Sequence, residues 1–138
     1  MSSRRHVKAY KNADREAVAE SDDPHALIAV LFDELLRHMN QFASDVENGK
    51  IKTGGASDPS SRALTILYGL QSSLNFENGG DIASNLFRLY EFARQQILHT
   101  MRSSELEGTR AAIAALADIR DAWQQMDRTG IQTRQRSE

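Results

Sequence analysis

The chain has 138 residues, 40% of them hydrophobic and 26% charged, which suits one domain with a real core. The absence of cysteine excludes disulfides and thiol catalysis, and a formal net charge of −2 argues against nucleic-acid binding. The longest apolar run, Ala26–Phe32, is far shorter than the ~20 residues of a membrane span. No secretory signal follows Met1, so we expect a cytoplasmic protein that is not inserted in a membrane.

Residues 1–22 are polar and predict an N-terminal arm, in which residues 1–11 carry four basic side chains and no acid. Val7 and Tyr10 are its only large apolar residues before Val18. They lie three apart, so one helical turn would place both on the same side. Two interpretations stay open, a frayed arm and a short segment that docks back onto the domain.

The first helix is predicted to begin at Asp23-Pro24, an N-cap acceptor followed by a proline, and to end near Asn48-Gly49. We call the apolar residues that share one face of a helix its seam. This seam steps by four and three residues, which is typical of helix bundles, and consists of Ile28, Phe32, Leu35, Met39, Phe42 and Val46. Leu27, Leu31 and Leu36 widen the apolar face.

After a Gly- and Ser-rich loop over residues 49–61, Asp58-Pro59 predicts the start of the second helix. Its seam is Leu64, Leu67, Leu70 and Leu74, with Ile66 and Tyr68 beside that line. Gly79-Gly80 predicts a tight reversal, and Asp81 the N-cap of the third helix.

The third helix is predicted to run to about Arg102, with a seam of Ile82, Leu86, Leu89, Ala93 and Ile97. Ser104 and Glu107 match a capping box for the fourth helix. Its seam is Ala112, Leu116, Ile119, Trp123 and Met126, and we expect Trp123 to be buried. The elements predict an all-α, antiparallel up-down-up-down four-helix bundle over residues 23–127, followed by a C-terminal tail over 128–138.

The sequence contains no residue pattern typical of a metal, phosphate-binding or catalytic site. It has no Glu-x-x-His pair for a bundle metal site, no phosphate-binding glycine motif and no recognisable catalytic triad. We therefore predict no catalytic residue, no cofactor and no metal. Instead, the wide apolar faces could either be buried in the core or form grooves for an amphipathic partner helix.

Three stretches resemble the flagellin export chaperone family, FliS: residues 73–90 around Gly79-Gly80, residues 23–37, and residues 116–123 ending in Trp123. The pair Ala9-Tyr10 is similar to the aromatic near the start of that family. Two features depart from the family pattern, Asp22-Asp23 before Pro24 and the long glycine-rich loop over 49–61.

The resemblance implies a cytosolic chaperone that binds the disordered C-terminal segment of flagellin, prevents its early polymerisation and delivers it to the membrane-embedded flagellar export gate. It also implies an arm that covers a groove until cargo displaces it. The residues predicted to bind the partner are Val7 and Tyr10 in the arm, and Leu27, Leu31, Ile66, Leu70, Phe87 and Tyr90 in grooves flanked by the first three helices. Alternatives are a protein-binding adaptor without export cargo and a bundle that forms a weak homodimer, with an enzyme a distant third.

Overall fold

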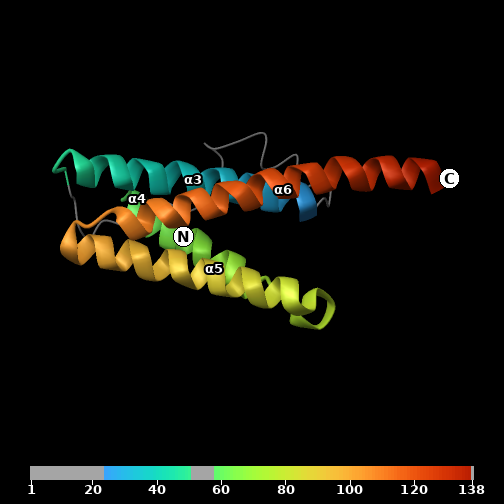
Figure 1. The fold of residues 1–138 in the computed structure, drawn as a ribbon, viewed down its shortest axis with the longest axis horizontal. Helices are drawn as coiled ribbons and strands as arrows, with labels where there is room; N and C mark the ends of the chain where they lie inside the picture. Colours follow the sequence, from blue (N-terminus) through green and yellow to red (C-terminus); the bar gives the residue numbers. More distant parts are fainter. Residues whose placement is uncertain (1–23, 51–57, 138) are drawn as a thin grey trace, which may run out of the picture.

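The computed structural model describes residues 24–50 and 58–137, with side chains of the last helix described through Met126. These residues form four α-helices and no strand: α3 (Pro24–Glu47), α4 (Pro59–Ser72), α5 (Phe76–Ser103) and α6 (Glu107–Ser137). Successive helices run in opposite directions, and each packs on two neighbours, α3 and α5 both lying between α4 and α6 (Figure 1). The prediction of an all-α four-helix bundle is confirmed.

The first two helices begin where the proline signals place them. Pro24 is the first residue of α3, although Asp23, its predicted cap, lies outside the described residues. Asp58 has the extended backbone of an N-cap (φ −63°, ψ 144°) and Pro59 follows it. The carboxylate of Asp58 makes no capping hydrogen bond to the helix. The start is marked instead by Pro59, because the N–H that proline lacks would have no hydrogen-bond acceptor within the helix at this position.

The reversal between α4 and α5 comes earlier than predicted. The chain turns over residues 73–75, and Asn75, not Asp81, is the N-cap of α5, its side chain accepting a hydrogen bond of 3.0 Å from the Asn78 N–H. Gly80 (φ 49°, ψ −123°) lies inside α5 and kinks it. The prediction of a left-handed glycine that interrupts the helix is therefore confirmed at Gly80, but the reversal begins earlier, so that one helical turn already precedes this glycine.

The capping box predicted for the last helix is also wrong. Ser104 has a left-handed backbone (φ 62°) and ends α5, its N–H donating to the Thr100 carbonyl at 2.8 Å, and α6 begins only at Glu107. Two buried hydroxyl groups hold this turn together, since the Oγ1 atoms of Thr100 and Thr109 lie 2.7 Å apart. Thr100 also donates to the Glu105 carbonyl at 2.6 Å. These bonds satisfy polar groups that would otherwise be costly to bury.

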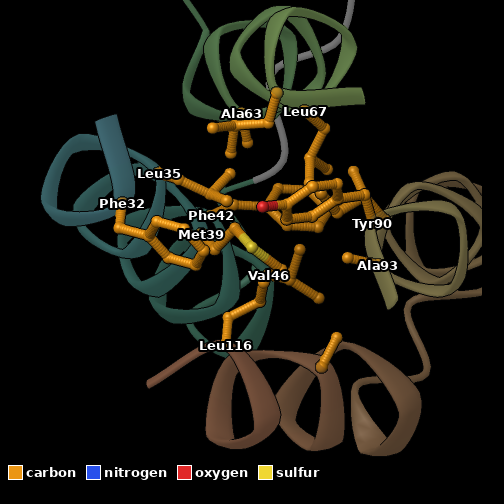
Figure 2. Close-up of a cluster of buried hydrophobic side chains, with 13 residues drawn as sticks. Phe32, Leu35, Met39, Phe42, Val46, Ala63, Leu67, Tyr90, Ala93 and Leu116 are labelled. Atoms are coloured by element: carbon orange, nitrogen blue, oxygen red, sulfur yellow. The ribbon is translucent and has the colours of Figure 1, made fainter. Parts of the chain in front are cut away.

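The core is built from all four helices (Figure 2). The seam of α3 is buried as predicted from Phe32 to Val46, and the ring of Phe32 lies 6.2 Å from that of Tyr90 on α5. The core is completed by Ala63, Leu67 and Leu70 from α4, Ala93 and Ile97 from α5, and Ala112 and Leu116 from α6. The buried residues lie mainly in the half of the bundle that contains the α5–α6 turn.

Two residues predicted for the core seams are instead exposed. The side chain of Ile82 on α5 is 69% exposed and that of Met126 on α6 is 60% exposed. The physical reason is that the start of α5 lies well away from the distal part of α6, so these two parts of the helices do not pack on each other (Figure 1). Trp123 is only half-buried, which corrects the expectation of a buried ring.

Helix α6 continues through Ser137, beyond the residue at which the predicted domain ends. The division into arm, bundle and tail stays a prediction, and residues 1–22 lie outside the described part of the chain. None of the described helices combines the length and the hydrophobicity needed to cross a bilayer.

Candidate functional site

The described residues contain no cluster of three or more histidine, aspartate or glutamate side chains that could hold a metal ion. Glu34, which the sequence places four residues before His38, makes an ion pair with Arg37 at 2.8 Å and lies 3.4 Å from His38. This arrangement is an ion-pair group along one side of α3. It does not supply three or more metal ligands.

The residues predicted to bind a partner occupy three kinds of position. Leu27 and Phe87 are exposed, by 39% and 41%. Leu31 and Ile66 are half-buried and pack against the core. Leu70 and Tyr90 are core residues, 1% and 2% exposed, so a partner could touch them only if the helices separated. Val7 and Tyr10 lie outside the described residues.

Burial also affects the chemistry of Tyr90. Removal of its phenol group from water raises the pKa of Tyr90 to about 12, because the charged form is penalised in the core. The hydroxyl group therefore stays protonated at any physiological pH. Tyr90 supports the surface from beneath, and its ring packs among side chains of α3 and α4 (Figure 2).

Tyr68 of α4 and Phe76 and Phe87 of α5 are exposed aromatic side chains, and we call this set the aromatic patch. Tyr68 is 70% exposed and Phe76 is 50% exposed. The rings of Phe76 and Phe87 are 6.1 Å apart and tilted by 59°, a favourable geometry for an aromatic pair. Large apolar groups gathered on a surface are typical of interaction sites.

The early reversal explains how this patch forms. Because α5 begins at Phe76, its first turn precedes the kink at Gly80, and Phe76 comes to lie beside a residue eleven positions further along. In the sequence, Phe76 falls within the predicted reversal, so it is not among the residues predicted to bind a partner. Tyr68 had a usable signal, since it falls beside the seam of its helix.

A hydrogen-bond network joins α4 to α5 beside the aromatic patch. Gln71 donates to Glu91 at 3.2 Å, and the Nε of Arg94 donates to the same carboxylate at 2.9 Å. Hydrogen bonds from Arg94 first and then from Gln71 lower the pKa of Glu91 to about 2. The aromatic patch thus lies on two helices that are joined by hydrogen bonds.

At the start of α3, near Leu27, a second set of contacts fixes α3 to α6. The rings of His25 and Trp123 are stacked, with centroids 4.0 Å apart and planes only 7° apart. Trp123 Nε1 donates to the His25 carbonyl at 2.9 Å, and His25 Nε2 lies 3.0 Å from the Trp123 carbonyl. Arg120 binds both carboxylate oxygens of Asp33, at 2.7 and 3.2 Å, and this hydrogen bonding raises the pKa of Arg120.

Taken together, these features describe apolar side chains on a rigid helical frame, in a region without catalytic groups. Such a surface can bind the apolar face of another polypeptide. It has no arrangement of nucleophile, base or metal ligands in the described residues that would carry out a reaction.

The comparisons with known proteins agree with the motifs. The family model described as "Flagellar protein FliS" matches residues 6–130. The flagellar secretion chaperone FliS of Salmonella typhimurium is 30% identical over 121 residues, 87% of this chain and 88% of that protein. The protein of the same name in Vibrio cholerae is 28% identical over 120 residues, 87% of each chain.

A third relative, the flagellar secretion chaperone FliSB of Pseudomonas aeruginosa, is 28% identical over 117 residues, 85% of this chain and 91% of that protein. The resemblance drawn from residues 23–37, 73–90 and 116–123 is therefore confirmed. Because the family model spans nearly the whole chain, this protein belongs to the FliS family of flagellar proteins, a family of non-enzymatic chaperones.

Proposed function

We propose that this protein is a cytoplasmic export chaperone that binds the disordered C-terminal segment of flagellin. It prevents that segment from polymerising early and delivers it to the flagellar export gate. The observation that carries the proposal is the exposed aromatic patch of Tyr68, Phe76 and Phe87. The names of the relatives, all flagellar secretion chaperones, support the same class of cargo.

A segment that forms helices in a filament has an apolar face, and covering that face on a chaperone removes the nucleus for assembly. Anchors at helical spacing would enter the aromatic patch and the surface around Leu27, Leu31 and Ile66, while Leu70 and Tyr90 support that surface from the core. Ordering the segment costs conformational entropy, so binding can be specific and still reversible.

The test is isothermal titration calorimetry of the intact protein with a peptide that spans the C-terminal segment of the host's flagellin. We expect saturable one-to-one binding with a negative heat-capacity change, the sign of apolar burial. Phe87→Ser should weaken binding at least about tenfold, as loss of a buried aromatic anchor does.

Phe92→Ser is the matched control for Phe87→Ser. Phe92 is on the same helix and is 40% exposed against 41% for Phe87, but five residues along an α-helix place it about 140° around the axis. Equal losses in both variants would contradict the aromatic patch as the binding surface. A folded protein that binds no flagellin peptide would instead favour the adaptor without export cargo.

The arm is tested by Tyr10→Ala. If Val7 and Tyr10 compete with cargo or contact the gate, this change will shift the affinity for flagellin or for the gate component and leave the melting temperature nearly unchanged. A large fall in melting temperature without a change in either affinity would make Tyr10 a core residue.

A further inference from the structure

The first turn of α5 is folded back against the rest of its helix. In a straight helix, Phe76 and Phe87 would lie on the same face but about 16 Å apart along the axis. Their rings would keep that spacing, because side chains on a helix all lean toward its N-terminus. The ring centroids are instead 6.1 Å apart. The turn that carries Phe76 therefore lies much closer to Phe87 than a straight helix allows.

Gly80 produces this bend. Its backbone (φ 49°, ψ −123°) is not helical, and it lies between the first turn and the remainder of α5. A Cβ atom placed on Gly79 would be 2.9 Å from the Cβ atom of Ala83, whereas Cβ atoms four residues apart in a regular helix are about 5–6 Å apart. Glycine at both positions thus permits a bend that side chains would hinder.

The folded-back turn, residues 76–79, has hydrogen bonds of its own. The side chain of Asn75 accepts a hydrogen bond from the Asn78 N–H at 3.0 Å, and the Asn75 carbonyl accepts one from the Gly79 N–H at 2.8 Å. Both bonds end before Gly80. Backbone rotation at Gly80 and in the connection from α4 can therefore move this turn as a unit without breaking either bond. We call residues 76–79 the clip.

The contact between the clip and Phe87 is weak enough to be exchanged for another. Neither ring belongs to the core, since Phe76 is 50% exposed and Phe87 is 41% exposed. An aromatic pair of this kind favours the closed arrangement over an open one by about two- to tenfold. A partner side chain that covers Phe87 more completely can therefore displace the ring of Phe76.

The clip also shows which kind of group Phe87 accepts, a large apolar side chain presented from one turn of helix. We propose that Phe76 occupies the position of a cargo side chain on Phe87 in the free protein, and that cargo displaces the clip by rotation at Gly80. This inference rests on the proposed function, and it makes Phe76 a competitor of the cargo. Because only the open form binds, the clip lowers the apparent affinity for cargo.

The test is biolayer interferometry of the intact protein with the C-terminal flagellin peptide, which measures both rate constants. Phe76→Ser should raise the affinity about three- to tenfold, because nearly all of the free protein is then open. The gain should lie in the association rate constant, since the clip is already displaced in the complex and does not affect dissociation. Phe92→Ser, on the same helix and 40% exposed, should change neither rate constant.

Gly80→Ala opens the clip by a different route. A side chain disfavours φ +49° by more than the ring contact stabilises, so alanine should release Phe76 from Phe87. This variant should show the same gain in association, and the double variant with Phe76→Ser no further gain, because both changes remove one contact. Far-UV circular dichroism checks that each variant is folded. Nuclear Overhauser contacts between the two rings should be present in the unchanged free protein and absent in Gly80→Ala and in the complex.

Weaker binding by Phe76→Ser would make Phe76 an anchor for the cargo, which would overturn the clip and leave the proposed function intact. Unchanged association in both Phe76→Ser and Gly80→Ala would also contradict the proposal, and so would a contact between Phe76 and Phe87 that persists in the complex. If neither the unchanged protein nor Phe76→Ser binds the peptide, flagellin is the wrong cargo, and the proposal of a clip that competes with it is wrong as well.

Discussion

Trp123 shows how one side chain can connect two helices without entering the core. Its indole ring stacks on His25 and its Nε1 donates to the His25 carbonyl, so it contributes both a ring contact and a hydrogen bond. The neighbouring pair of Arg120 and Asp33 lies on the surface, where ion pairs contribute little to stability. We therefore expect Trp123 to provide most of the stabilisation between the start of α3 and α6.

Replacing Trp123 should separate these two contributions. Trp123→Ala should lower the free energy of unfolding by about 2 kcal/mol, less than the ~3–5 kcal/mol of a fully buried aromatic, because the ring is half-buried. Trp123→Phe keeps a ring that can stack but loses the donor, and should cost about 1 kcal/mol. Urea unfolding followed by far-UV circular dichroism measures both, with the exposed Gln125→Ala as control. Equal costs for the two variants would contradict a role for the ring contact.

Glu91 provides a pH-dependent contribution to stability. Its pKa is about 2 in the folded protein and has an ordinary value of 4.5, so the unfolded state binds a proton first as the pH falls. The stabilisation is therefore fully present above about pH 4.5 and is lost between there and about pH 2. Because the side chain is partly exposed, solvent screening keeps the effect modest.

Glu91→Gln should lower stability at neutral pH and flatten the loss of stability between about pH 4.5 and pH 2. Urea unfolding at a series of pH values measures this. Glu77→Gln, an exposed change on the same helix, is the control for removal of one negative charge. A variant whose pH profile is parallel to that of the unchanged protein would show that the network of Gln71 and Arg94 does not stabilise the charged form of Glu91.

Helix ends were the least predictable feature of the individual elements. Prolines marked the starts of α3 and α4 correctly, because proline suits the first helical position for a local reason. The glycine pair correctly indicated a break at Gly80 but not the first residue of α5, and the capping box was wrong because Ser104 ends α5. A residue with a left-handed backbone can form a turn, end a helix or kink it. Which of these three occurs depends on the tertiary contacts of the neighbouring segments.

Alanine substitutions at two glycines, one in α4 and one in α5, should change the stability of the protein in opposite directions. Gly69 lies inside α4 with open space where a Cβ atom would be, so Gly69→Ala should stabilise the protein by about 0.5–1 kcal/mol. Gly80 has φ +49°, which side chains disfavour, so Gly80→Ala should destabilise it by about 1–3 kcal/mol. Thermal and urea unfolding of both variants measure these changes in stability. A stabilising Gly80→Ala would mean that the kink is not required.

Across the bundle, the two halves differ in how they are built. The half with the α5–α6 turn holds most of the buried residues and the buried pair of Thr100 and Thr109. The other half has two diverging helix pairs with exposed apolar groups, among them Phe76 and Ile82. Regions with few buried contacts open more easily, and surfaces that bind partners are often drawn from them.

Hydrogen–deuterium exchange should reveal this difference. Amides within residues 90–100 and 109–116 should exchange slowly, near the limit set by global unfolding, while those of residues 76–86 and 119–126 should exchange faster. Addition of the flagellin peptide should slow exchange in residues 76–87, where the aromatic patch lies. Uniform protection along α5 in the free protein would contradict a division into a stable and a more open half.

The amino-acid sequence alone was enough to predict an all-helical bundle, its four helices and the buried seam of α3, because each follows from the spacing of residues within one helix. It could not distinguish Leu70 and Tyr90, which are buried, from Phe87, which is exposed, since all three are apolar residues on amphipathic helices. It also assigned Ile82 and Met126 to the core. Whether an apolar face is covered depends on the position of the neighbouring helix, and only the divergence of α5 from α6 in the tertiary structure decided that these two side chains stay exposed.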